Sequence, residues 1–388
     1  MYLDHLRAVN KNGAFTKAKI MLGMVATLTL SAALTSNACA DAIIKPPILE
    51  KLQQQRKPLA PETIKWMARW KGVDLEKPAF KLDELSGSTS VYLKVRKPDA
   101  TEKDGYKAYG TFLSRSNSAN PYSELAYFNL AAILGYDGIF RPTVRYALGS
   151  RARQAFKTLL NNTAIPPGNR LENKKRVLRD IATGKPLNGC LKSKKLDTNI
   201  AYDAIADIKA GLPRKTNSII KALQAASPQP SVSQKFEPVT GYKSNMLQLA
   251  REYSIIMTLD TIFQQWDRYS GANVVLAKDK AGIAHFYSTD NGGANLEKSP
   301  AKVLNNLKYF SRYDRKTITR LKALYGFLVN PAKGFLGYKN AEAFVVDLGL
   351  YGELKPAEYV ALLKRNIGLL LNQVAIVEKK LSNKAYLP

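Results

Sequence analysis

Three polar residues suited to phosphoryl chemistry lie at the two ends of a predicted β-hairpin. Asp267 and Asn273 precede its first strand, Asn273–Ala277, and Asp290 follows its second, Ile283–Thr289. Runs of β-forming residues joined by a glycine-containing turn predict such a hairpin, which would bring the three side chains to one edge. Aspartate and asparagine oxygens are suitable ligands for Mg²⁺ or Mn²⁺, and a second carboxylate can orient or deprotonate a hydroxyl. Positioning, a metal and charge neutralisation are what phosphoryl transfer requires.

Each of these residues also has a purely structural interpretation. Asp267 and Arg268 could cap the preceding helix and form a surface salt bridge, Asn273 could be a turn residue, and Asp290-Asn291-Gly292 is a common turn sequence. Their combination in one helix–loop–hairpin frame favours chemistry over these separate interpretations.

The scarcity of histidine and cysteine excludes several other kinds of site. The chain has 388 residues with two His and two Cys, and one of each falls within the first 40 residues. The remaining His285 and Cys190 cannot form a zinc site or a disulfide framework within one chain. A histidine-based hydrolase would have to use His285 as its base.

The first 40 residues have the pattern of a signal peptide. Four basic residues precede the fifteen-residue apolar run Ile20–Leu34, and Ala38-Cys39-Ala40 matches the small-x-small cleavage pattern. We expect export to the periplasm or the exterior, with no membrane span in the mature chain.

The elements that must position the polar residues follow from periodicity and from helix start and stop signals. Residues 41–80 form an extension containing a helix at Pro61–Trp70. Residues 81–149 predict a small sheet carrying one helix, which begins at Asn120-Pro121 and ends at Gly135. Its strands are Ser90–Val95, Tyr106–Arg115 and Ile139–Leu148.

The segment 150–245 differs in composition from its neighbours. It has 18 Lys and Arg against six Asp and Glu, whereas the chain without its first 40 residues has 55 against 30. We interpret it as a basic insertion of helices and loops, with helices at 151–160 and 217–226. Residues 246–388 are mainly helical, beginning with the helix Met246–Gln265 and ending with one that starts at Pro356.

Three passages resemble the atypical kinases, a group that includes the secretory-pathway (Golgi casein) kinases, the HipA kinases and the phosphatidylinositol kinases. The run WDRYSGANVVL from Trp266 is similar to their Asp-Arg catalytic loop, and Asp290-Asn291-Gly292 is similar to the metal-binding Asp-Asn-Gly of the secretory-pathway branch. The run PYSELAYFNLAAILG from Pro121, with FRPTV from Phe140, is similar to that branch's glutamate-bearing helix.

The resemblance implies an α+β, two-lobed protein-kinase-like fold. A small β-rich N-lobe with one main helix (81–149) would precede the insertion and a larger helical C-lobe (246–388). ATP with Mg²⁺ or Mn²⁺ would be bound between the lobes.

The resemblance also implies a role for each matching residue. Asp267, with Arg268 beside it, would be catalytic and would orient the acceptor hydroxyl. Asn273 would hold the metal and Asp290 would bridge it to the phosphates, while Glu124 would be the helix glutamate that pairs with a phosphate-binding lysine.

That lysine is missing from the second predicted strand, where Leu113 stands near its expected position. Arg115 lies two residues further along, hence on the same strand face, and is the first candidate to replace it. Lys94 and Lys107 are weaker candidates.

Two hypotheses remain open from the sequence. The first is an exported kinase that transfers a phosphoryl group to a hydroxyl of an acidic protein, a glycan or a lipid recruited by the basic insertion. The second is a catalytically dead pseudokinase or binding module that uses 150–245 to hold an anionic polymer, membrane or acidic partner. We expect no nucleic-acid partner, because no aromatic-interleaved basic motif is present.

Overall fold

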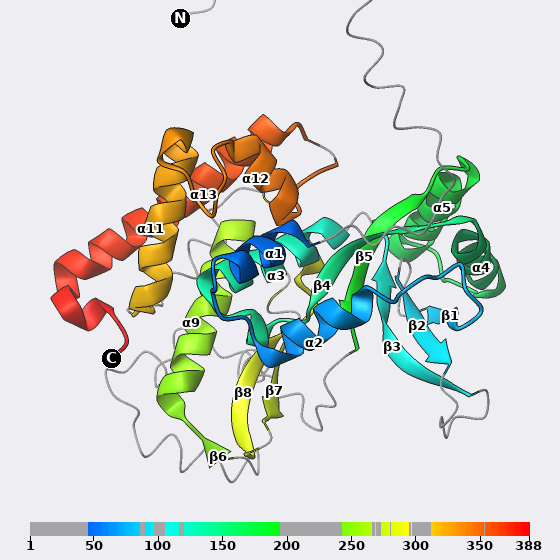
Figure 1. Cartoon of the computed structure of the whole chain (residues 1–388), viewed down its shortest axis with the longest axis horizontal. Helices are drawn as coiled ribbons and strands as arrows, with labels where there is room; N and C mark the ends of the chain where they lie inside the picture. The colour runs from blue at the N-terminus through cyan, green and yellow to red at the C-terminus, as the bar shows by residue number, and fades with distance from the viewer. Residues whose placement is uncertain are drawn as a thin grey trace, which may run out of the picture. The chain divides into compact units, whose positions relative to one another are not determined.

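The computed structural model describes most of the chain that follows the predicted signal peptide. It describes residues 46–85, 90–96, 105–115, 120–194, 243–265, 268, 273–279, 281–294, 296, 312–352 and 354–388. The signal peptide, the predicted helix at 217–226 and Asp267 lie outside these residues. The described part is a mixed α+β structure, with an antiparallel sheet in its N-terminal half and a helical C-terminal part (Figure 1).

The N-terminal sheet has five strands in the order β1-β2-β3-β5-β4. The strands β2, β3 and β4 match predicted strands, whereas β1 and β5 were not predicted. Their bounds are β1 Phe80–Leu85, β2 Ser90–Arg96, β3 Tyr106–Leu113, β4 Thr143–Leu148 and β5 Leu187–Ser193.

Strand β5 corrects our interpretation of the whole segment 150–245 as an insertion. It lies between β3 and β4, and Leu191 is opposite both Phe112 and Val144. A Cβ on Gly189 would lie 2.1 Å from the carbonyl oxygen of Leu113, so only glycine allows this close strand approach. The two helices α4 (Ser150–Asn162) and α5 (Asn169–Ala182) therefore lead the chain back into the sheet.

Helix α3 (Pro121–Leu134) crosses the centre of the molecule (Figure 1). The Asn120 side chain accepts a hydrogen bond from the Tyr122 amide, and Gly135 ends the helix in a left-handed conformation. These are the predicted start and stop signals. The helix is buried on all sides, because it contacts β4 and β5 as well as α9 and α11.

The N-terminal extension contains α1 (Pro47–Gln54) and the predicted α2 (Pro61–Trp70). Trp66 and Trp70 are buried in the apolar cluster of the N-terminal sheet, where Trp66 packs edge-on against Tyr109 at 5.2 Å. The extension is thus part of the folded body.

A second, three-stranded sheet precedes the C-terminal helices. Its order is β6-β8-β7, from β6 (Lys243–Ser244), β7 (Val274–Lys278) and β8 (Ile283–Ser288). Helix α9 (Met246–Phe263) packs on β8 and α3. The remaining elements are η1 (Asp137–Ile139), η3 (Asn291–Gly293), α11 (Arg315–Val329), η4 (Pro331–Lys333), α12 (Ala341–Leu348), α13 (Pro356–Leu381) and η5 (Ser382–Ala385).

Helix α13 is long and apolar enough to cross a membrane by length and composition alone. In the structure its face Leu363, Ile367, Leu370 and Val374 is fully buried, and the helix contacts α9, α11 and α12. This packing is typical of a core helix.

Candidate functional site

A buried ion pair joins the N-terminal sheet to helix α3. Lys192 Nζ on β5 lies 2.6 Å from Glu124 Oε1 in the first turn of α3, and the two side chains are 6% and 2% exposed. Burial alone raises the pKa of the Glu124 carboxyl, but the charge of Lys192 and its hydrogen bond outweigh burial and hold that pKa below its usual range. The Glu124 carboxyl is therefore ionised in the folded protein.

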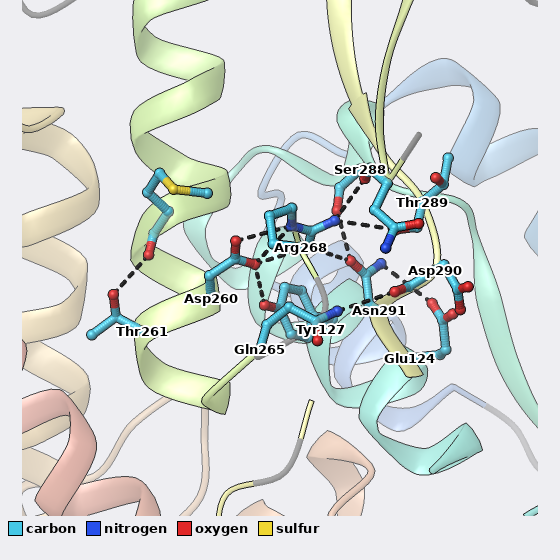
Figure 2. Close-up of polar contacts among 12 residues, drawn as sticks. Glu124, Tyr127, Asp260, Thr261, Gln265, Arg268, Ser288, Thr289, Asp290 and Asn291 are labelled. Carbon is cyan, nitrogen blue, oxygen red and sulfur yellow. Dashed lines mark hydrogen bonds and ion pairs between the residues drawn. The ribbon is translucent and has the colours of Figure 1, made fainter. Parts of the chain in front are cut away.

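The second oxygen of Glu124 links this pair to the turn after β8. Asn291 Nδ2 donates to Glu124 Oε2 at 3.3 Å. Asn291 Oδ1 accepts from the Ser288 hydroxyl at 2.6 Å and from Arg268 Nη2 at 2.8 Å (Figure 2). Both the oxygen and the nitrogen of the Asn291 side-chain amide thus have hydrogen-bond partners, which hold in place the turn that begins at Asp290.

Arg268 is the buried centre of the network. Its guanidinium donates to Asp260 of α9 through Nε at 2.9 Å and Nη2 at 2.8 Å, and to the Asn273 carbonyl through Nη1 at 2.6 Å (Figure 2). Tyr127 also donates to Asp260, at 2.5 Å. Burial acts to lower the pKa of Arg268, but Asp260 more than compensates and raises it.

This burial corrects the interpretation of Arg268 as part of a surface salt bridge, because its side chain is fully buried. The catalytic role of Arg268 stays a prediction. Through Asp260, Asn273 and the Thr289 carbonyl at 3.1 Å, Arg268 ties the end of α9 to both strands of the hairpin.

The hairpin brings Asn273 and Asp290 to the same edge, as the sequence predicts. Val274 is opposite Ser288, and the Thr289 amide donates to the Asn273 carbonyl at 3.0 Å. Asp290 is exposed and has a left-handed backbone with φ of 50°. Its main-chain carbonyl accepts from Gln265 Nε2 at 3.1 Å. Asp267 lies outside the described residues, between Gln265 and Arg268.

Arg141 adds a second buried cation to this region. It is 8% exposed, and its guanidinium donates to the Ser193 carbonyl through Nε at 3.0 Å and through Nη2. Burial lowers the pKa of Arg141, while the charges of Glu124 and Asp290 act to raise it. Both carboxylates therefore lie within electrostatic range of this cation.

The three cations proposed from the sequence lie elsewhere. Arg115 is within electrostatic range of Arg176 and Asp180 of α5; burial and Arg176 lower its pKa. Lys94 Nζ lies 2.8 Å from Asp83 on β1, and Lys107 is opposite Val95 in the sheet. It is Lys192 that pairs with Glu124.

Sequence reasoning missed Lys192 and Arg141. The run LNGCLKS of β5 has a central glycine and no β-branched residue, and it lies in a strongly basic segment. The available signal was the pair Cys190-Leu191 followed by Lys192, a short apolar run with a lysine at its end. For Arg141 the signal was its place beside Phe140 in the passage that resembles the kinases.

The two ring nitrogens of His285 each lie close to a carboxylate. Its Nδ1 lies 2.6 Å from Glu252 Oε1, and its Nε2 lies 3.5 Å from Asp279 Oδ2. These contacts join the β7–β8 hairpin to α9.

The donor set fits a metal bound together with a phosphate ligand. Among the described residues no group of three His, Cys, Asp or Glu side chains could hold a metal ion by itself. Mg²⁺ usually takes one or two carboxylates and completes its shell with substrate phosphates and water. An exposed Asp290, the neighbouring Asn273 and the cations Lys192 and Arg141 together match that chemistry.

The fold is similar to those of Fam20 and the Golgi casein kinase, at low sequence identity. No protein-family model and no curated protein sequence matches this chain. Hydra Fam20 with sugar matches at 12% identity and a TM-score of 0.47, over 79% of this chain and 87% of that one. The Golgi casein kinase with Mn and ADP bound matches at 13% identity and 0.45, over 79% and 75%. A second structure of the Golgi casein kinase matches at 13% identity and 0.44, over 77% and 73%.

Proposed function

We propose that the protein is an exported, two-lobed kinase-like phosphotransferase that moves the γ-phosphoryl group of ATP to a hydroxyl acceptor. The observation that carries the proposal is the buried Lys192–Glu124 pair, which Asn291 connects to the turn bearing Asp290. A buried cation held beside an exposed carboxylate is suited to a phosphate that arrives with a divalent metal.

The residues would divide the work as follows. Lys192, oriented by Glu124, would bind a phosphate oxygen of ATP, and Arg141 would add positive charge nearby. Asp290 and Asn273 would hold Mg²⁺ or Mn²⁺, which neutralises charge on the phosphates. Asp267 would orient the acceptor hydroxyl and accept its proton. The hydroxyl oxygen would bond to the γ-phosphorus while the bond from that phosphorus to the bridging oxygen breaks, and ADP would leave with the bridging oxygen.

The pseudokinase hypothesis loses its main motivation with Lys192. It rested on the absence of a strand lysine that could pair with Glu124, and the Lys192–Glu124 pair of β5 and α3 supports such a lysine. A purely structural ion pair would still show the same geometry, so the two hypotheses must be separated by nucleotide binding and transfer.

Export and the acceptor class are part of the proposal. The signal-peptide pattern of residues 1–40 supports export to the periplasm or the exterior. The basic composition of 150–245 supports an acidic protein, glycan or lipid as the acceptor.

The test compares two aspartates of the same hairpin. Asp290→Asn removes one carboxylate charge at the proposed metal site, whereas Asp279→Asn removes one at the opposite, exposed turn. Purified mature protein is incubated with γ-labelled ATP and Mn²⁺ or Mg²⁺, with casein, heparan oligosaccharide or phosphatidylinositol as acceptors. Nucleotide binding is measured separately by calorimetry.

We expect Asp290→Asn to lower transfer by about 100-fold, because metal stabilisation of the transition state contributes several kcal/mol. Asp279→Asn should leave transfer unchanged. If wild-type protein neither binds ATP with metal nor labels itself or an acceptor, or if both variants behave alike, the proposal is wrong.

A further inference from the structure

A wide basic depression lies at the ends of α3 and α9 that are remote from the candidate site. Its volume is about 1080 Å³, and Tyr136 after α3, Gln248 in the first turn of α9 and Leu387 near the C-terminus contribute to its lining. Glu124 and Asp260 are near the other ends of the same two helices. Six cationic side chains line the depression: Arg251, Arg312, Arg315, Lys316, Arg320 and Lys384.

Among the side chains that line the depression there is one carboxylate, that of Asp314, and it already has neutral partners. Asp314 caps α11, where its Oδ2 accepts from both the amide and the hydroxyl of Thr317 at 2.8 Å. It also accepts a hydrogen bond from Tyr136; burial and this contact raise the pKa of that phenol. Beyond the rim, Glu378 accepts from the Tyr386 hydroxyl and lies 3.8 Å from Lys322.

Three of the arginines have partners other than aspartate or glutamate side chains. Arg315 lies over the Tyr386 ring at 4.1 Å, Arg320 donates to the Ile133 carbonyl at 3.3 Å, and Arg251 donates to the main-chain oxygen of Pro388. Within the described part of the chain, none of the six lining cations forms an ion pair with an aspartate or glutamate.

One of the lining arginines acts electrostatically on a further cation nearby. Burial and the charge of Arg320 lower the pKa of Lys57, a seventh cation beside this group. Like charges gathered with so little compensation favour a ligand that brings several negative charges at once.

The shape of the depression and the types of its side chains restrict the class of ligand further. Four of the six cations are arginines, whose planar forks match the oxygens of phosphate groups. The surface is hollow, which suits a compact ligand. Tyr386 is only 8% exposed beneath Arg315, so it offers no free ring on which a nucleic-acid base could stack.

We infer that this depression binds a compact polyanion that carries several phosphate groups. The site shares no residue with the proposed phosphotransferase site, so it stands or falls independently of that function. The phosphate groups could belong to a free molecule or to a lipid headgroup, and the experiment below separates these sources.

The experiment measures binding of tripolyphosphate to the mature protein by calorimetry, without metal. The test variant is Arg312→Gln/Lys316→Gln/Lys384→Gln, three side chains that form no hydrogen bond or ion pair with other described residues. The control variant, Lys157→Gln/Arg179→Gln/Lys185→Gln, removes the same charge from α4, α5 and the turn that follows α5.

We expect the test variant to raise the Kd for tripolyphosphate at least tenfold and the control to change it less than twofold. Thermal melts check that the variants fold. If the triple variant melts early, Lys316→Gln alone replaces it and is expected to raise the Kd about threefold. A second arm uses vesicles of phosphatidylcholine with phosphatidylinositol bisphosphate. If the protein binds these vesicles more tightly than tripolyphosphate, and the test variant loses that binding, the ligand is a lipid headgroup. Hexaglutamate binding as tightly as tripolyphosphate, equal losses in both triple variants, or no binding in either phosphate arm would overturn the inference.

Discussion

Removing one charge of the Lys192–Glu124 pair should lower the free energy of unfolding much more, per charge removed, than removing both charges together. The perturbation is a double-mutant cycle of Glu124→Gln and Lys192→Met. Glutamine keeps the volume of Glu124 and an acceptor for the Asn291 amide, and methionine keeps the length of the lysine stem.

The magnitude follows from the burial of the pair. With side chains 6% and 2% exposed at a separation of 2.6 Å, removal of one partner leaves an uncompensated buried charge, which costs about 3–5 kcal/mol. Glu124→Gln should be the more harmful single change, because Lys192 and Arg141 would then share no buried carboxylate. In the double variant neither charge remains, so its cost should be about 3 kcal/mol less than the sum of the two single costs.

Urea unfolding of the mature protein, followed by far-UV circular dichroism and tryptophan fluorescence, measures the four free energies of unfolding. The control cycle is Glu172→Gln and Lys175→Met, whose charges are 2.8 Å apart but 53% and 55% exposed. Solvent screens that pair, so we expect no measurable coupling there. If a single variant is too unstable to fold, rescue of folding in the double variant is the expected result.

The reasoning is refuted if the loss of stability in the double variant equals the sum of the losses in the two single variants within about 0.5 kcal/mol. Such additivity would mean that Lys192 and Glu124 do not depend on each other in the folded state.

Two further predictions concern the hairpin and the sheet. The hydrogen bond that His285 donates to Glu252 raises the pKa of His285 above its usual value of 6.5. The pair's contribution to stability is therefore complete below about pH 6.5 and is lost as the pH rises through the raised pKa. His285→Gln should therefore lower the free energy of unfolding more at pH 5 than at pH 9, and an equal loss at both would contradict this. A Cβ at Gly110 would lie 2.4 Å from the Lys192 carbonyl oxygen, so Gly110→Ala should destabilise the protein by about 1–3 kcal/mol in urea unfolding. The control Gly326→Ala, which meets no atom within 4 Å in α11, should be neutral or stabilising.

Much of the local structure follows directly from the sequence. Asn120, Pro121 and Gly135 mark the ends of α3, and the alternation on either side of a glycine turn marks the β7–β8 hairpin. These signals are local, because a cap or a tight turn satisfies backbone groups of its own neighbours. For the same reason the convergence of Asn273 and Asp290 was predictable.

The partner of Glu124 was decided by tertiary structure alone. Lys192 reaches it because β5 enters the sheet between β3 and β4, and Leu113 is opposite Cys190, far away in the sequence. Strand pairing of this kind depends on register and on the close approach that Gly189 allows, and neither is visible in composition or periodicity. The basic composition of the surrounding segment pointed instead to a solvated insertion.

The role of Arg268 shows the same division. The sequence by itself determined that an Asp-Arg pair lies between α9 and the hairpin, together with the polar residues that could bind metal and phosphate. Only the packing of α9 against the hairpin decided that Arg268 is buried on Asp260 and Asn291. A charge can occupy the interior only where several separate elements supply its partners, and a linear sequence does not show which elements will meet.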